Sequence, residues 1–371
     1  MGSQKPKVLL LGDIEHAHDA WKTLGDIAEL IGPKARERDE FLEECKSGAL
    51  DGVIATYRTF DSVKITGRFD EDLINALPKS LKFICHNGAG YDQVEIPPCT
   101  ARGIRVSNVP TAVDDATADT NMFLILGALR GYNPGLFSLR EGKWRGGRPR
   151  RLCNFHQAYS VPGHPPPPLG HDPEGKLLGI LGMGGIGRNL KKKAEAFGMR
   201  VQYHNRRKLS DELAGGAKYV SFDELLSTSD VISLNLPLNV RDWCKVTHKG
   251  NYILTLLQNN TRHMISTHQF EKMKTGVVIV NTARGAVIDE DALVQALDSK
   301  KVRSCGLDVY EAEPQIHPGL VANPGVLLVP HLGTYTVETQ TAMETWNIDN
   351  VRSAVETGKL KSPVNEQADM K

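Results

Sequence analysis

A glycine-rich hexapeptide between an apolar run and an amphipathic stretch constrains this 371-residue chain more than any other feature. The run Leu178–Leu181 leads into Gly182-Met183-Gly184-Gly185-Ile186-Gly187, and helical spacing continues from Arg188 to Phe197. Glycines at these positions let a strand turn tightly, let a phosphate approach the backbone and let a helix pack closely on the strand. The first N–H groups of such a helix favour anions. We therefore predict a nucleotide-binding turn, although glycines at this spacing alone also occur in ordinary turns.

Short apolar runs alternate with amphipathic stretches along most of the chain, which predicts β-α-β units on parallel sheets. The runs form two series, and a chain of this length with 40% apolar residues has enough material for two cores. The first series is Val8–Leu11, Gly52–Ala55, Lys82–Cys85 and Ile104–Ser107; the second is Leu178–Leu181, Arg200–Tyr203, Val231–Leu234, Val277–Val280, Ser304–Leu307 and Val326–Val329.

Two longer stretches have helical spacing. Asp114–Gly131 carries apolar residues at helical intervals after several capping Asp and Thr residues, and Val337–Glu356 carries them roughly on one face. We expect the first helix to connect the two domains and the second to return the C-terminus to the first domain.

Composition excludes several classes of function. Lys and Arg (45) nearly balance Asp and Glu (44), so a net charge of +1 gives no field that would hold nucleic acid or an anionic membrane. No apolar run reaches the length of a membrane span, and Met1–Lys7 lacks the apolar core of a signal peptide. The six cysteines lack metal-ligand spacing. We expect no metal site, and a cytoplasmic protein with reduced thiols.

The strand expected after the glycine turn ends in a basic segment, His204-Asn205-Arg206-Arg207-Lys208. A dinucleotide-binding domain that takes NADH carries an acidic residue near this point, where it accepts a hydrogen bond from the ribose 2′-hydroxyl. Asn205 removes the charge that would repel a 2′-phosphate, and the guanidinium groups of Arg206 and Arg207 offer forked donors for one. We therefore expect NADPH to be preferred, with NADH as the alternative if the two arginines are only a solvated surface pair.

Polar residues also follow three later apolar runs, at the strand ends where open α/β sheets bind ligands. Arg284 stands in Asn281-Thr282-Ala283-Arg284-Gly285, and a cation there would hold a carboxylate and polarise a carbonyl that receives a hydride. Glu313 and His331 follow the next two runs. Together they would make a proton donor, because a carboxylate orients an imidazole and favours its protonated form.

These residues together resemble the D-isomer-specific 2-hydroxyacid dehydrogenases, and among them the fungal glyoxylate/hydroxypyruvate reductases. Glu313 follows Arg284 by 29 positions and His331 follows Glu313 by 18, as in the catalytic trio of that family. The motifs that carry the resemblance are Asn87-Gly88-Ala89-Gly90-Tyr91-Asp92, Gly182–Gly187, Asn281-Thr282-Ala283-Arg284-Gly285, Gly306-Leu307-Asp308-Val309, Glu313-Pro314 and Pro330-His331.

The resemblance implies roles for each group of residues. Arg284 would bind and polarise the substrate, His331 would donate the proton, and Glu313 would orient His331. The loop of Asn87, Gly88, Ala89 and Gly90 would bind the substrate carboxylate through main-chain N–H groups. Asp308 would hold the nicotinamide carboxamide, and Thr117 would reach the cofactor phosphates. The full cofactor-binding set would be Thr117, Gly182, Gly184, Gly185, Ile186, Gly187, Asn205, Arg206, Arg207, Pro237, Ala283 and Asp308.

The resemblance also implies an architecture. A Rossmann cofactor domain of residues 113–334 would be inserted into a flavodoxin-like substrate domain of residues 1–112 and 335–371, with the active site in the cleft between them. We further expect a homodimer, because Asp114–Gly131 contains more apolar residues than one buried stripe needs, including Met122, Phe123, Leu124, Ile125 and Leu126.

Two alternatives to a glyoxylate or hydroxypyruvate reductase stay open at this point. The first is another member of the same superfamily that acts on 3-phosphoglycerate, formate or a bulkier 2-oxo acid, since pocket shape does not follow from the sequence. A nucleotide-sensing corepressor would use the same fold to bind protein partners and would keep the same motifs. Near-neutral charge favours the enzyme, although Arg148–Arg151 is a short basic run.

Two segments are longer than the resemblance leads us to expect. Residues 146–170 are basic and proline-rich, which indicates an exposed insertion rather than a docking motif. Residues 240–258 separate Leu236-Pro237-Leu238-Asn239 from Asn260-Thr261-Arg262-His263, two segments that are almost adjacent in the family. We hypothesise that Val240–Gln258 is a retained intron translated in frame, because a Val codon begins with GT and a Gln codon can be CAG.

Sequencing the transcript across codons 235–263 tests this hypothesis. We expect a spliced message that joins the codon of Asn239 to that of Asn259. A mature message that retains all the intervening codons would show that the segment is genuine.

Overall fold

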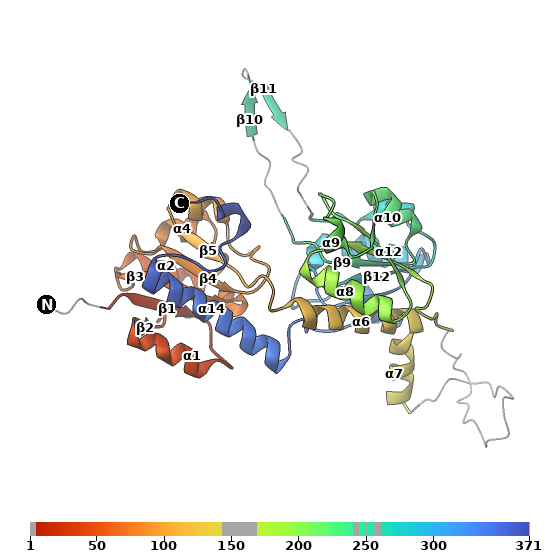
Figure 1. Cartoon of the computed structure of the whole chain (residues 1–371), viewed down its shortest axis with the longest axis horizontal. Coiled ribbons are helices and arrows are strands. Elements are labelled where there is room, and N and C mark those ends of the chain that lie inside the picture. The colour runs from red at the N-terminus through yellow and green to blue at the C-terminus, as the bar shows by residue number, and fades with distance from the viewer. Residues whose placement is uncertain (1–4, 143–168, 240–244, 249–250, 255–260, 371) are drawn as a thin grey trace. The chain divides into compact units, whose positions relative to one another are not determined.

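The computed structural model describes residues 5–142, 169–239, 245–248, 251–254 and 261–370, with only the backbone pairing described for 245–254. The chain forms two compact units. The first comprises Met1–Val113 and Thr334–Lys371, and the second comprises Asp114–Gly333. The sequence predicts boundaries at residues 112/113 and 334/335, which lie one residue before and one residue after those of the two units. Figure 1 labels the elements of both units.

The first unit is built on a five-stranded parallel sheet in the order β2-β1-β3-β4-β5, which is the flavodoxin-like order. Its strands are β1 (Lys7–Leu11), β2 (Glu29–Ile31), β3 (Val53–Thr59), β4 (Phe83–Asn87) and β5 (Arg105–Ser107). Its helices are α1 (His18–Lys22), α2 (Arg38–Lys46), α3 (Val63–Thr66), α4 (Glu71–Ala76), α5 (Ile96–Ala101) and α14 (Val337–Thr357), with 3-10 turns η1 (Thr23–Asp26), η2 (Phe60–Ser62) and η4 (Asn365–Gln367).

The second unit is built on a seven-stranded parallel sheet in the order β14-β13-β12-β9-β6-β7-β8. Its strands are β6 (Leu177–Leu181), β7 (Arg200–His204), β8 (Lys218–Tyr219), β9 (Val231–Leu234), β12 (Val277–Asn281), β13 (Val302–Leu307) and β14 (Val326–Leu328). Its helices are α6 (Asp114–Arg130), α7 (Tyr132–Arg140), α8 (Gly185–Ala196), α9 (Asp211–Ala214), α10 (Phe222–Thr228), α11 (Thr267–Lys272), α12 (Glu290–Asp298) and α13 (Pro318–Ala322), with the 3-10 turn η3 (Gly285–Val287). The strand order reverses between β6 and β9, which makes this pair a topological switch point.

The core of the second unit lies on both faces of its sheet. Along β12, Val277 and Ile279 pack in one apolar cluster, while Val278 and Val280 pack in another. Successive strand residues point to opposite faces, so a strand covered on both sides is apolar throughout. This explains why the sequence shows continuous apolar runs rather than alternation.

Several elements differ from those expected. The strands β3 and β4 run on to Thr59 and Asn87, beyond the predicted ends at Ala55 and Cys85, and β2 and β8 were not expected. The helix after the glycine turn begins at Gly185, three residues before the predicted start, because the last glycines of the motif already have helical geometry. Strands β10 (Lys245–His248) and β11 (Asn251–Leu254) pair antiparallel with each other and join neither parallel sheet.

The expectation that the additional apolar residues of α6 serve a subunit interface is wrong for most of them. Met122, Leu124 and Ile125 are buried within their own unit, where α6 packs on β12, β13 and α8. Phe123 is the exception, with 51% of its surface exposed. The helix buries more than one stripe because it contacts both a sheet and a helix.

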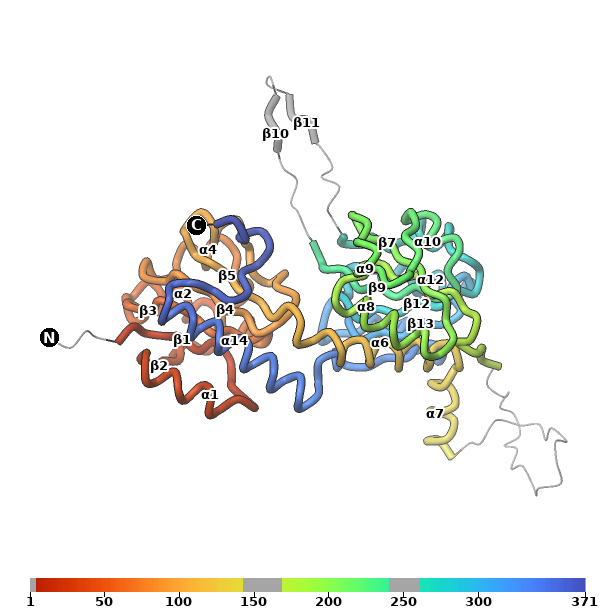
Figure 2. Tube along the Cα trace, viewed as in Figure 1, coloured from red at the N-terminus to blue at the C-terminus, as the bar shows by residue number. Residues whose placement is uncertain are grey.

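Helix α14 follows the second unit in sequence but packs on the first. It lies against β3 and β4, and its Ile348, Val351 and Ala354 join the apolar cluster on that face of the sheet. Figure 2 shows this blue helix beside the red and orange strands. Among the described residues, no helix is long and apolar enough to cross a membrane.

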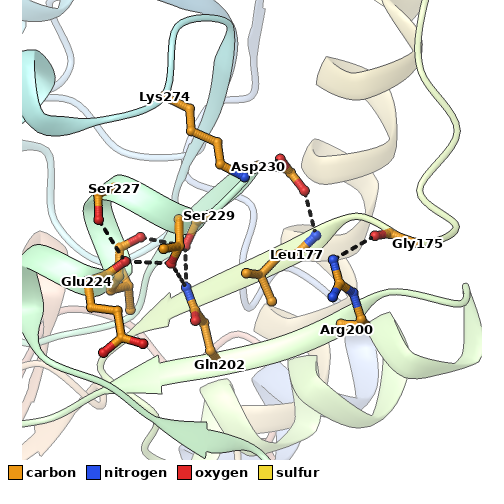
Figure 3. Close-up of polar contacts among 11 residues, drawn as sticks. Gly175, Leu177, Arg200, Gln202, Glu224, Ser227, Ser229, Asp230 and Lys274 are labelled. Carbon is orange, nitrogen blue, oxygen red and sulfur yellow. Dashed lines mark hydrogen bonds and ion pairs between the residues drawn. The ribbon is translucent and has the colours of Figure 1, made fainter.

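Polar contacts fasten the amino ends of the strands in the second unit (Figure 3). The Asp230 carboxylate accepts hydrogen bonds from the Leu177 N–H at 2.9 Å and from the Lys274 ammonium at 2.9 Å. Burial opposes ionisation of Asp230, but the Leu177 N–H and the charge of Lys274 outweigh it, so its pKa lies below the ordinary value.

Replacing Asp230 with Ala should lower the free energy of unfolding by about 1–3 kcal/mol at pH 7, because the Leu177 N–H and Lys274 lose their acceptor. Since folding lowers the pKa of Asp230, its contribution is present above its ordinary pKa of 3.8 and is lost as the pH falls through the folded value. Denaturant unfolding at pH 7 and pH 3 measures both effects. The exposed Asp298→Ala is the control, and equal stability of the two variants at pH 7 would contradict the assignment.

Candidate active site

Each glycine of the turn after β6 meets a different structural requirement. Gly182 has a φ of 95°, and a Cβ there would lie 2.8 Å from the backbone of Asn235. A Cβ on Gly187 would lie 3.0 Å from the Gly182 carbonyl oxygen, so this glycine allows α8 to pack against the strand. A Cβ on Gly184 would meet nothing within 4 Å. The open space at Gly184, next to the first N–H groups of α8, suits a phosphate.

A cavity of about 890 Å³ opens beside this turn at the carboxyl ends of β6, β7 and β9, which is the topological switch point of the sheet. Its size and mixed polarity suit a dinucleotide cofactor rather than a single small metabolite. The lining residues include six of the predicted cofactor residues, namely Gly182, Gly184, Asn205, Arg206, Arg207 and Pro237.

Asn205 is tied to the glycine turn. Its side-chain oxygen accepts a hydrogen bond from the Met183 N–H at 2.6 Å, and its main-chain oxygen accepts one from the Tyr219 hydroxyl at 3.0 Å. Asn205 therefore fixes the turn against the end of β7, a role that the sequence did not indicate. The exposed Arg206 and Arg207 follow it along the wall of the cavity.

The wall at Pro237 is closed by residues that flank the predicted insertion. The Thr261 hydroxyl donates to the Pro237 carbonyl oxygen at 2.8 Å and accepts from the Asn239 N–H at 2.8 Å, while the Thr261 N–H donates to the Asn239 carbonyl oxygen at 3.0 Å. The two ends of the segment are therefore joined directly. The segment 240–258 lies outside the described residues apart from the backbone of β10 and β11, as does most of 146–170.

Arg284 stands in a turn that its neighbours hold rigidly at the end of β12. The side chain of the buried Asn281 accepts from the Ala283 N–H at 3.0 Å and donates to the Arg284 carbonyl oxygen at 2.9 Å. A Cβ on Gly285 would lie 1.8 Å from the carbonyl carbon of Tyr310. Only glycine therefore lets the Arg284 turn pack against the loop that leads to Glu313.

Glu313 and His331 are in direct contact. The Glu313 carboxylate lies 2.9 Å from Nδ1 of His331, and its other oxygen accepts from the Tyr310 N–H at 2.9 Å. Burial opposes ionisation of Glu313, but its hydrogen bond to His331, the charge of that ring and the charge of Arg284 outweigh burial, so the pKa of Glu313 lies below its usual range. Glu313 is thus an ionised partner that fixes the imidazole through Nδ1.

Asp308 holds the backbone around His331. Its buried carboxylate accepts from the N–H groups of Leu332 at 2.5 Å and Gly333 at 2.9 Å, and its carbonyl oxygen accepts from the His331 N–H at 2.9 Å. These contacts keep His331 in the left-handed region, with a φ of 54°. Burial raises the pKa of Asp308 against the effect of these N–H groups. Thr117 is buried near Gly333, where a Cβ would lie 3.6 Å from the Thr117 hydroxyl.

The loop Asn87–Gly90 belongs to the first unit and follows β4. Three of its carbonyl oxygens are engaged: Gly88 accepts from the Val109 N–H at 2.9 Å, Ala89 from the Asn108 side chain at 2.8 Å and Gly90 from His86 at 2.8 Å. In a trans peptide the N–H points away from the carbonyl oxygen. Within the part of the chain that the structure describes, the N–H groups of Ala89, Gly90 and Tyr91 donate to no protein acceptor. Successive main-chain N–H groups of this kind are the donors that an anion-binding concavity would need.

The second unit therefore places the predicted trio and the glycine turn at the carboxyl ends of its parallel strands. Sequence reasoning missed Asn281 and the supporting roles of Asp308 and Asn205. The sequence did contain a signal for these roles, because each of these polar residues stands at the carboxyl end of an apolar strand. Parallel sheets bind ligands at these strand ends.

Comparison with known proteins gives consistent matches. The model of the family "D-isomer specific 2-hydroxyacid dehydrogenase, NAD binding domain" matches residues 122–242 and 252–333 and leaves 243–251 unmatched, within the predicted insertion. The chain is 51% identical over 362 residues to 4-methyl-2-oxopentanoate reductase A of Aspergillus oryzae, covering 98% of both chains.

Two solved structures share the whole fold. A glyoxylate reductase from Paecilomyes thermophila is 51% identical, with a TM-score of 0.86, and the match covers 98% of this chain and 99% of that one. An NADPH-dependent glyoxylate/hydroxypyruvate reductase from Sinorhizobium meliloti, in complex with NADP and malonate, is 25% identical, with a TM-score of 0.77 and 98% coverage of both chains. This chain belongs to the D-isomer specific 2-hydroxyacid dehydrogenases.

Proposed function

We propose that this dehydrogenase uses NADPH to reduce a small 2-oxo acid, such as glyoxylate or hydroxypyruvate, to the D-2-hydroxy acid. The observation that carries the proposal is the contact between ionised Glu313 and Nδ1 of His331, with the charge of Arg284 acting on the same carboxylate. A proton donor next to a fixed guanidinium is the arrangement that carbonyl reduction requires.

The reduction divides between the cofactor and three side chains. NADPH, when bound, supplies the hydride that forms the new C–H bond at the carbonyl carbon. Arg284 holds the substrate carboxylate and polarises the carbonyl, so that negative charge develops on its oxygen beside a cation. Nε2 of protonated His331 gives that oxygen a proton, and the hydroxy acid results. Glu313 keeps the ring in place and stabilises its protonated form.

The cavity in the second unit has the parts needed to hold the cofactor. Gly184 leaves space for the pyrophosphate at the start of α8, and Arg206 and Arg207 would bind a 2′-phosphate. Thr117, Gly185, Ile186, Pro237, Ala283 and Asp308 complete the proposed set. The NADP in the Sinorhizobium meliloti enzyme supports the same choice of cofactor. NADH remains the alternative to be measured.

The choice of 2-oxo acid is the main point for experiment. The two relatives at 51% identity are named for a small substrate, glyoxylate, and for a branched one, 4-methyl-2-oxopentanoate. Purified protein should be assayed with glyoxylate, hydroxypyruvate and 4-methyl-2-oxopentanoate, each with NADPH and with NADH. We expect the highest kcat/KM with a small acid and NADPH. Absence of turnover with every acid would overturn the proposed function.

We also propose a cytoplasmic homodimer. Helix α7 buries none of its residues, and Tyr132, Leu136, Phe137 and Leu139 leave between 47% and 57% of their surfaces exposed. Phe123 of α6 adds to this apolar surface. A second copy of the chain would cover it. In the cytoplasm the four described cysteines, all free and buried, would stay reduced.

The cofactor assignment predicts a selective loss. Replacing both Arg206 and Arg207 with Ala should raise the KM for NADPH by about tenfold or more while changing that for NADH little, because only NADPH carries the 2′-phosphate. Steady-state kinetics with both cofactors measures the ratio. The matched control removes two other exposed cations of the same unit, Arg200 and Lys218. Equal losses with NADPH and NADH would show that the arginines do not read the phosphate.

The proton relay predicts distinct effects on turnover. His331→Gln should lower kcat by about a hundredfold or more with little change in cofactor affinity, whereas Arg284→Lys should impair both kcat and KM because a point charge cannot replace the guanidinium fork. Glu313→Gln should move the pH at which reduction falls off to lower pH, because reduction needs protonated His331 and the neutral amide stabilises it less. An unchanged pH profile together with near-normal turnover of His331→Gln would refute the relay.

If the apolar surface of α7 forms the dimer interface, charged substitutions in α7 should convert the dimer to a monomer. Sedimentation at micromolar concentration should give twice the chain mass for the wild type and the chain mass for Leu136→Glu/Phe137→Glu, because two carboxylates without cationic partners are costly to bury in an apolar interface. Leu213→Glu changes an exposed leucine of α9 and should leave the dimer intact. A monomeric wild type would count against the proposal.

A further inference from the structure

The loop Asn87–Gly90 is supported from beneath by His86, a histidine with no exposed surface. Nε2 of His86 lies 2.8 Å from the Gly90 carbonyl oxygen, and Nδ1 lies 3.2 Å from a terminal nitrogen of Arg58. A guanidinium has only donors, so Nδ1 must accept from Arg58. The single N–H of the neutral ring is therefore on Nε2, and it donates to the Gly90 carbonyl oxygen. Arg58 thus selects the tautomer that holds the loop.

Arg58 is itself fixed on several sides. It has no exposed surface and donates to the Gln93 side chain at 2.7 Å and to the Ser62 hydroxyl at 3.3 Å, with its guanidinium 5.0 Å from the centre of the Phe69 ring. Burial lowers the pKa of Arg58 to about 10, and the charge of Asp92 opposes the shift. Arg58 therefore stays a cation at neutral pH and remains a donor.

Gly88 packs directly against the imidazole ring of His86. A Cβ on Gly88 would lie 2.7 Å from Nε2 of His86 and 3.2 Å from Cε1. The backbone of Gly88 is not in the left-handed region, so the requirement for glycine here is one of space. The imidazole occupies the volume that a side chain at position 88 would need, and the loop rests directly on it.

The peptide that His86 anchors joins Gly90 to Tyr91. Because the Gly90 carbonyl oxygen is held by His86, the Tyr91 N–H of the same peptide points the other way. The two preceding peptides are anchored by Asn108 and Val109, neither of which is a titratable or cationic group. His86 is thus the one anchor of the three that is set by a buried charge.

We propose that His86, held in one tautomer by Arg58, is a positioning residue for the 2-oxo acid: it aims the Tyr91 N–H so that the loop binds the substrate carboxylate. The proposal rests on the proposed function of the loop Asn87–Gly90. It assigns the pair no contact with the reacting carbonyl, so its effect falls on substrate binding rather than on the chemical step.

His86→Phe keeps a ring of similar size and removes both nitrogens. We expect the KM for glyoxylate to rise by about tenfold or more, with kcat at saturating glyoxylate and the Kd of NADPH changed by less than about threefold. His86→Gln should recover much of the loss, because an amide can donate to Gly90 and accept from Arg58. His18→Phe, on the exposed start of α1, is the matched control. A wild-type KM in His86→Phe, or equal losses of glyoxylate and NADPH binding, would overturn the proposal.

A second pair of variants decides the question if His86→Phe does not fold. Gly88→Ala presses on the imidazole, whereas Gly32→Ala adds the same methyl group where nothing lies within 4 Å. We expect only Gly88→Ala to raise the KM for glyoxylate, with NADPH binding unchanged. Equal KM values in the two variants would refute the positioning role. Failure of the proposed function differs visibly, since the wild-type enzyme itself would then turn over no 2-oxo acid.

Discussion

The rest of the second unit depends on one constraint: the carboxyl ends of all seven parallel strands lie on the same side of the sheet. Strands β12, β13 and β14 are neighbours, so the residues that follow them are brought within contact distance although they are far apart in sequence. Arg284, Glu313 and His331 each follow one of these strands. The glycine turn follows β6, two strands from β12, at the point where the strand order reverses.

Hydrogen bonds to the backbone turn this closeness into a fixed geometry. Asn281 holds the Arg284 turn from both sides, Asp308 holds the residues around His331, and Asn205 holds the glycine turn. Each of these side chains stands at a strand end and satisfies main-chain groups that would otherwise be left without partners. Groups that bind a charged ligand need such support, because a displacement of about 1 Å is costly in rate.

The loop Asn87–Gly90 of the first unit is held in a different way. No side chain of Asn87–Gly90 carries a charge, and the loop instead has its carbonyl oxygens tied inward so that its N–H groups face outward. The buried Arg58 contributes through His86 without being exposed. A buried cation is tolerated here because its donors are engaged by Gln93, Ser62 and His86.

The sequence by itself determined the two α/β sheets, the glycine turn and the family, and it named the candidate trio, because these depend on local spacing: apolar runs long enough for buried strands and glycines where a turn must form. Only the tertiary structure decided what supports them. Arg58 and His86 look like the end of an apolar run, so the predicted strands stopped before them. They are buried in β3 and β4 because each satisfies the other across neighbouring strands. Helix α6 likewise depends on tertiary contacts, because its additional apolar residues are buried by a sheet and a helix that the sequence does not place beside it. A pattern along the chain records which side chains avoid water; which groups satisfy one another depends on contacts between segments distant in sequence.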